Sequence, residues 1–155
     1  MANSLKPEST LRIQLLADFR HQLRLFLHFS EMAAARFDLQ PQQHQLLLQV
    51  AGAPDGVLAT VGYATERLGL CHNTVVELSK RSEEAGLVAR KQDEEDRRRV
   101  ILKLTPKGRK ILDALSEDHA RELNELAPQL IEALSALSSS AQKAVQSMSG
   151  GNRES

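Results

Sequence analysis

Three arginines, Arg97, Arg98 and Arg99, stand side by side in this 155-residue sequence, directly after the acidic run Asp93 to Asp96. A guanidinium group can bind a phosphate through two donors at once, and it fits the narrow minor groove of duplex DNA. The chemistry open to this run is therefore the binding of an anion such as nucleic acid. The alternative is a solvent-exposed turn in which the arginines pair with the neighbouring acids. In a mixed outcome, Asp96 holds one arginine while another reaches the groove.

The arginine run lies at the tip of a predicted β-hairpin. The strand candidates are residues 87–91 and 100–104, and apolar residues alternate along the second strand, so one face of the hairpin can be buried. The tip, residues 92–99, is too polar to belong to a core. Thr105 and Pro106 then supply the N-cap of a helix and a proline at its first position. The pattern predicts a hairpin that leads directly into a helix.

A helix-turn-helix pattern precedes the hairpin. Residues 60–70 have helical apolar spacing up to Gly69, and residues 72–85 form a second helix that ends at Gly86. The residues expected to pack inward from the second helix are Val75, Leu78, Ser82 and Ala85. In this motif the second helix lies in the major groove of DNA. Together with the hairpin, the pattern predicts a winged helix-turn-helix, a mainly α fold with a small β-hairpin wing.

The predicted DNA-binding residues lie on the outward face of the second helix and in the hairpin tip. They are His72, Asn73, Thr74, Glu77, Lys80, Arg81, Arg97, Arg98 and Arg99. The helix start could contact bases or phosphates, and Asn73 is also a good N-cap residue. Glu77 could accept a hydrogen bond from cytosine, or it could pair with Lys80 or Arg81 along the helix.

These segments resemble the MarR family of bacterial transcription regulators. The family's wing signature runs roughly D-x-R-D-R-R, then an apolar strand, then L-T-x-x-G, and it is matched by residues 93–98 and 104–108. Residues 39–44 (LQPQQH) and 63–70 (YATERLGL) resemble two further helical segments of the family. The similarity covers about residues 10–148.

Two positions depart from the family pattern. Glu95 stands where arginine is usual, so the salt bridge of that position is not carried over. Ser82 stands where leucine is common, so the recognition helix is expected to be packed more loosely than in other members.

Long helices with broad apolar stripes are predicted at both ends of the chain, at residues 9–37 and 106–148, the latter divided into two helices at Ala127-Pro128. Such faces need a partner, most simply a second copy of the chain. The resemblance implies that these segments interlock into a homodimer around a winged helix-turn-helix lobe at 41–105, in one composite domain of residues 1–155. Two recognition helices would then read half-sites about 34–36 Å apart in a pseudo-palindromic double-stranded operator.

The resemblance further implies a sequence-specific DNA-binding transcription regulator, in the first instance a repressor that a small aromatic effector releases. The candidates for lining an effector pocket are His21, Phe26 and His44. Two alternatives stay open. One is a helical dimer that uses its winged domain for protein interaction, and the other is a metal- or redox-responsive sensor of the same fold. Cys71, beside a helix N-terminus, is the residue on which redox sensing would depend.

Composition bounds the remaining classes of function. The chain is 41% hydrophobic and 26% charged, as one globular domain requires. Its 20 basic residues equal its 20 acidic residues, but the basic ones gather in the helix and hairpin segments, so a neutral total can hide a basic face. A single cysteine, no signal peptide and no membrane-length apolar run predict a cytoplasmic protein without a membrane segment. The sequence has no phosphate loop, no G-x-S-x-G and no closely spaced metal ligands, so we expect neither an enzyme nor a cofactor or metal.

Overall fold

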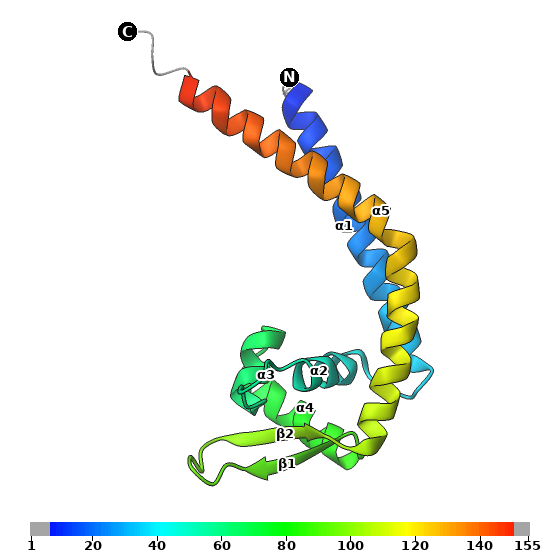
Figure 1. Cartoon of the computed structure of the whole chain (residues 1–155), viewed down its shortest axis with the longest axis vertical. Coiled ribbons are helices and arrows are strands. Elements are labelled where there is room, and N and C mark those ends of the chain that lie inside the picture. The colour runs from blue at the N-terminus through cyan, green and yellow to red at the C-terminus, as the bar shows by residue number, and fades with distance from the viewer. Residues whose placement is uncertain (1–6, 151–155) are drawn as a thin grey trace, which may run out of the picture. The chain divides into compact units, whose positions relative to one another are not determined.

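The structure is a computed structural model that describes residues 7–150, with the side chains of residues 9–139. Over that range the elements, shown in Figure 1, are α1 (Pro7–Ala35), α2 (Pro41–Ala51), α3 (Val61–Leu68), α4 (His72–Glu84), β1 (Val88–Gln92), β2 (Val100–Leu104) and α5 (Pro106–Gly150). This is the mainly helical fold with a β-hairpin wing that the sequence predicts. The chain divides into two compact units. The first unit comprises the residues up to Phe29 and those from Ala120, and the second unit comprises Ser30–His119.

Two predicted helix limits are wrong. α1 ends at Ala35 and not at residue 37, because the chain turns there and Asp38 adopts a left-handed conformation with φ 56°. α5 is one helix from Pro106 to Gly150 and is not divided at Pro128, which lies inside it. A proline removes one main-chain hydrogen bond and costs about 3 kcal/mol, and long helical segments on either side can absorb that cost. The side chains of residues 140–148, part of the predicted dimerisation segment, lie outside the described residues.

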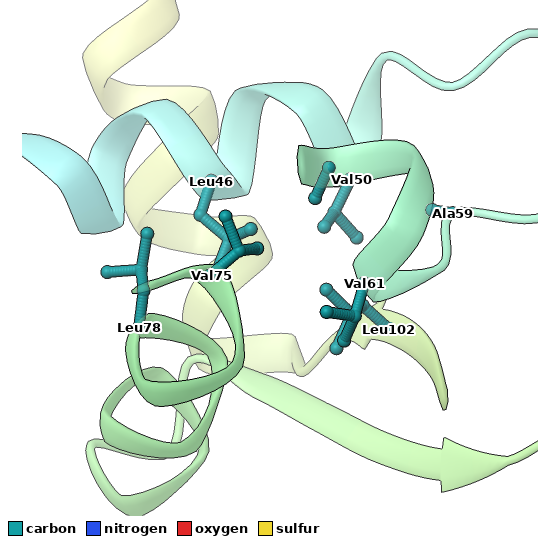
Figure 2. Packing of buried hydrophobic residues seen from close by; sticks show 8 residues of the cluster. Leu46, Val50, Ala59, Val61, Val75, Leu78 and Leu102 are labelled. Carbon is teal, nitrogen blue, oxygen red and sulfur yellow. The ribbon is translucent and has the colours of Figure 1, made fainter. Parts of the chain in front are cut away.

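The core of the second unit joins all three short helices to the wing, residues 88–104. Figure 2 shows the buried cluster, which consists of Leu46, Val50, Ala59, Val61, Ala64, Val75, Leu78 and Leu102. β1 and β2 are antiparallel with Arg90 opposite Leu102, and the main-chain N–H of Leu102 also donates to the carbonyl of Ala59, 2.8 Å away. The wing is therefore fixed to the helices by packing and by main-chain hydrogen bonds.

The inward face of α4 is close to the predicted one. Val75, Leu78 and Ser82 are buried as expected, but Ala85 is exposed and caps the helix, and Ser79 is buried in its place. The burial of Ser79 is tolerated because its hydroxyl is satisfied locally, donating to the carbonyl of Val76 at 2.7 Å. Ser82 Oγ is buried without a hydrogen-bond partner among the described residues. A serine at this position therefore stabilises the helix contact less than an apolar side chain would.

The L-T-x-x-G segment has a structural explanation at the junction of the wing with α5. The hydroxyl of Thr105 donates to the carbonyl of Gly86 at 2.6 Å and accepts from the main-chain N–H of Gly108 at 3.0 Å. It therefore caps α5 and ties it to the end of α4. A Cβ on Gly108 would lie 2.0 Å from the carbonyl oxygen of Leu87, so only glycine fits.

The first unit leaves many large apolar side chains exposed. They are Leu11, Ile13, Leu16, Leu23, Leu25, Leu27, Leu123, Ile131 and Leu134. Ile131 is the most exposed of them, at 63%. Exposed apolar side chains in such number are typical of an interface with another chain.

Candidate nucleic-acid interface

The helix-turn-helix is built by local capping. Thr60 caps α3, since its hydroxyl accepts from the N–H of Tyr63 at 3.0 Å, and Gly69 ends α3 in the left-handed region with φ 63°. The chain then turns through two residues and α4 begins at His72. These caps therefore place the turn between the two helices where it is predicted.

The start of α4 is open to solvent. Its N-cap is Cys71, which makes no side-chain cap, so the proposed capping role of Asn73 is wrong. Asn73 lies inside the first turn, beyond the position whose side chain can fold back on the N–H groups. The side chains of His72, Asn73 and Thr74 are all exposed, and the first turn contains no acid. The uncapped N–H groups and the positive end of the helix dipole favour an anion here.

The outward face of α4 continues with Glu77, Lys80 and Arg81, all of them exposed. Lys80 Nζ lies 2.7 Å from a carboxylate oxygen of Glu77. Glu77 therefore forms the intrahelical ion pair that was predicted as the alternative to a hydrogen bond from cytosine. The hydrogen bond from Lys80, and then its charge, lower the pKa of Glu77. Surface pairs of this kind are weak and exchange readily for other partners.

The wing tip, residues 93–99, is held from inside by Asp93. The sequence placed the whole tip outside the core, which is wrong for this residue, because Asp93 is only 5% exposed. Its carboxylate accepts from the N–H of Glu95 at 3.0 Å and lies 2.5 Å from Nη2 of Arg99. The main-chain N–H of Asp93 donates to the carbonyl of Arg99 at 3.0 Å. Burial is tolerated because one carboxylate oxygen accepts a hydrogen bond and the other faces the charge of Arg99.

The three wing arginines differ in their partners. Arg98 forms a two-pronged ion pair with Asp96, with Nε 3.1 Å and Nη2 3.2 Å from its oxygens, and this pair lowers the pKa of Asp96. Arg97 lies within ion-pair distance of no carboxylate of the described residues. Acids of the tip therefore hold Arg98 and Arg99 and leave Arg97 open, and contact of an arginine with DNA stays a prediction.

α3, α4 and the wing together line one open groove of about 300 Å³. Its lining residues are Thr60, Val61, Gly62, His72, Val76, Arg90, Arg98, Arg99 and Val100. The groove brings His72 of the predicted set together with two of the wing arginines. No acidic residue is among its lining residues, and its charged side chains are the three arginines Arg90, Arg98 and Arg99.

Arg90 is the arginine of the groove that the predicted set of DNA-binding residues does not contain. Side chains alternate between the two faces of β1, so Arg90 shares the inward face of the wing with the buried Val88, and it stands opposite Leu102 of β2. That alternation is the signal that could have found it, because a charged residue on the inward face of a strand needs a partner or a function.

The candidate effector residues are divided between the two units. His21 is exposed and Phe26 is half-buried, both in the first unit, while His44 belongs to the second unit and is 2% exposed. Their part in an effector pocket stays a prediction.

His44 lies in a small polar network. Ser30 Oγ is 3.4 Å from Nδ1 of His44 and 2.8 Å from Nε2 of His119, and the two rings lie 5.0 Å apart. Burial, followed by the charge of His119, lowers the pKa of His44 to about 4.

The redox-sensor alternative depends on Cys71, and the metal-sensor alternative requires a cluster of metal-ligating side chains. Cys71 is a free, exposed thiol at the N-cap of α4. Among the residues that the structure describes, no three histidine, cysteine or acidic side chains come close enough to hold a metal ion. Within the same residues, no helix is long and apolar enough to cross a membrane.

The helix-turn-helix, the wing and the groove between them define a winged helix-turn-helix protein. The sequence profile of the MarR family matches residues 37–99, the stretch that contains α2, α3, α4 and β1. A search of curated proteins found no match.

Three solved structures of the same fold cover 83–96% of the chain. AbsC, a MarR family transcriptional regulator from Streptomyces coelicolor, is 18% identical and matches 96% of this chain and 99% of its own with a TM-score of 0.69. The MepR–DNA complex of S. aureus is 24% identical over 83% and 94% of the two chains, with a TM-score of 0.64. Reduced AbfR bound to DNA is 26% identical over 85% and 98%, with a TM-score of 0.58.

These comparisons confirm the resemblance to the MarR family. Residues 37–99 match the MarR family, and the chain has the fold of the MarR family transcription regulator AbsC.

Proposed function

We propose that this protein is a homodimeric repressor that binds a pseudo-palindromic duplex in the cytoplasm and is released by a small aromatic effector. The observation that supports its DNA-binding surface is the groove lined by His72, Arg98 and Arg99, in which the start of α4 and the wing meet without an acid between them. A duplex laid on this surface would place α4 in the major groove and the wing tip on the neighbouring minor groove.

The exposed apolar side chains of α1 and α5 in the first unit support the dimer. Side chains such as Leu11, Leu27 and Ile131 are each more than half exposed, and a second copy would bury them. A two-fold axis then places two copies of α4 about 34–36 Å apart, one helical turn of DNA. The operator should be a near-palindrome with that spacing.

A direct binding titration tests the proposal. Fluorescence anisotropy is measured with a labelled duplex from upstream of the protein's own gene, at two salt concentrations and with excess random duplex. One dimer per site, binding that survives the competitor and a steep loss of affinity with salt are expected. Affinity no tighter than about 10⁻⁴–10⁻⁶ M, equal for both duplexes, would reject a sequence-specific regulator of this promoter.

The effector is tested on the same complex. A panel of small phenolic and benzoic acids is added to the bound duplex, and release by one of them at unchanged ionic strength is expected. Zinc and peroxide form separate arms, because release by either of these alone would favour the metal or redox sensor instead. The protein-interaction alternative predicts a stable dimer that binds no duplex.

A further inference from the structure

We infer that Arg90 is a phosphate-binding residue of the DNA surface and binds one backbone phosphate diester in the groove between α4 and the wing. This inference rests on the proposed function and adds a contact from β1, in the same groove as His72 of the helix start and the wing arginines. The three arginines that line the groove differ in how closely their side-chain donors are already paired with carboxylates.

Arg90 has hydrogen-bonding capacity to spare. Its nearest carboxylate is that of Glu83, where Nη1 and Oε2 are 3.8 Å apart, beyond hydrogen-bonding distance. The other oxygen of Glu83 accepts instead from the main-chain N–H of Arg90 at 3.0 Å. Nε of Arg90 is buried and has no hydrogen-bond partner among the described residues. Such an unsatisfied charged donor costs free energy that an anionic ligand can recover.

The other two arginines of the groove are already engaged. Arg98 donates from Nε and Nη2 to Asp96, and Arg99 lies 2.5 Å from Asp93. Arg90 is thus the groove arginine whose side chain is only loosely paired, with Glu83 at 3.8 Å and with Nε unsatisfied among the described residues. Its side chain is 20% exposed, compared with 91% for Arg98. A half-buried guanidinium has less bound water to lose and is held by the strand, so an ion pair formed with it is stronger than one at the surface.

The chemistry of the site favours a phosphate over a base edge. Arg90 lies on β1, in the wing, whereas the residues positioned to reach base edges are at the start of α4. Contacts to phosphates fix the register of the protein on the duplex and carry no sequence information. Loss of Arg90 should therefore weaken binding to specific and random duplexes by similar factors.

The neighbouring Lys91 supplies a matched control. It carries the same charge one residue along the strand, but its side chain is 68% exposed and pairs with Glu94 at 2.7 Å. Its side chain points to the opposite face of the hairpin from that of Arg90.

The experiment measures the slope of log affinity against log salt concentration for the full chain, on the upstream duplex and on a random duplex. Arg90→Ala should reduce the slope by about 0.9, the value for one neutralised phosphate, while Lys91→Ala leaves it unchanged. Arg90→Lys should restore the slope but not the full affinity, because lysine keeps the charge and loses the forked geometry.

The outcomes separate this inference from the proposed function. An unchanged slope in Arg90→Ala, or an equal loss in Lys91→Ala, overturns the role of Arg90 while DNA binding stands. Wild-type protein that binds neither duplex overturns both. Thermal unfolding of each variant identifies a fold defect. If Arg90→Ala does not fold, the comparison is made with Arg90→Gln, and an unchanged slope there counts equally against the inference.

Discussion

Nη2 of Arg99 lies 2.5 Å from Oδ2 of Asp93, and the side chain of Asp93 is only 6% exposed while that of Arg99 is 44% exposed. The ion pair therefore joins the surface of the wing tip to its interior. Because the main chains of the same two residues are also hydrogen-bonded, at 3.0 Å, the pair closes the tip into a fixed loop. That loop determines where Arg97 and Arg98 are presented.

Substituting the buried acid should loosen the wing. Asp93→Asn keeps an oxygen for the N–H of Glu95 but removes the charge beside Arg99, so the free energy of unfolding should fall by about 1–3 kcal/mol. Urea denaturation at neutral pH measures the change. Glu94→Gln is the control, since Glu94 is 81% exposed and its pair with Lys91 should contribute under about 1 kcal/mol. Equal losses in the two variants would show that Asp93 is not a structural anchor.

The glycine of the L-T-x-x-G segment should not tolerate a methyl group. Gly108→Ala places a Cβ 2.0 Å from the main-chain oxygen of Leu87, which cannot rotate away, so a loss of about 1–3 kcal/mol is expected. Gly62→Ala is the matched control in α3, where the nearest atom to the new Cβ is 3.6 Å away. Alanine there should stabilise by up to about 1 kcal/mol through helix propensity. Thermal melts that shift in the same direction for both variants would contradict this explanation.

The buried His44 should make stability depend on pH. Its pKa falls from 6.5 to about 4 on folding, so between these values the unfolded chain takes up a proton that the folded chain does not. The contribution to stability is complete above pH 6.5 and is lost as the pH falls towards about 4. At about 1.4 kcal/mol for each unit of pKa, the loss by about pH 4 is on the order of 3 kcal/mol.

The measurement for His44 is urea denaturation at several values of pH between 7 and 4. His44→Asn keeps a side-chain nitrogen or oxygen near Ser30 and cannot titrate, so its stability should change less steeply over the same range. The comparison concerns the slope and not the absolute stability, because the substitution also alters packing. Parallel curves for the variant and the wild type would assign the pH dependence to other groups.

The thiol of Cys71 reports on the start of α4 without any substitution. It is the sole cysteine of the chain and is exposed at the N-cap of α4. If α4 enters the major groove, bound operator should slow alkylation by N-ethylmaleimide several-fold, as followed by mass spectrometry. High salt, which releases the duplex, should restore the rate. An unprotected thiol in a fully bound complex would mean that another surface contacts DNA.

Local sequence patterns predicted the helix-turn-helix and the wing well, because capping residues such as Thr60 and Gly69 act on their immediate neighbours. What escaped prediction depends on contacts between distant residues. Asp93 is buried only because the hairpin brings Arg99 back to it, and Arg90 matters only because β1 places it beside α4. The local sequence at Pro128 predicts a helix break, although α5 continues through this residue.

The central claim is that the wing arginines and the start of α4 form one DNA surface. The most direct test compares wild type with the Arg97→Ala, Arg98→Ala, Arg99→Ala triple variant in anisotropy titrations on the same duplex over a range of salt concentrations. We expect the variant to stay folded and dimeric, although less stable because Asp93 loses Arg99, to bind at least about tenfold more weakly and to show a shallower salt dependence, by about 0.9 for each phosphate that it no longer neutralises. Affinity and salt slope equal to those of the wild type would contradict the claim.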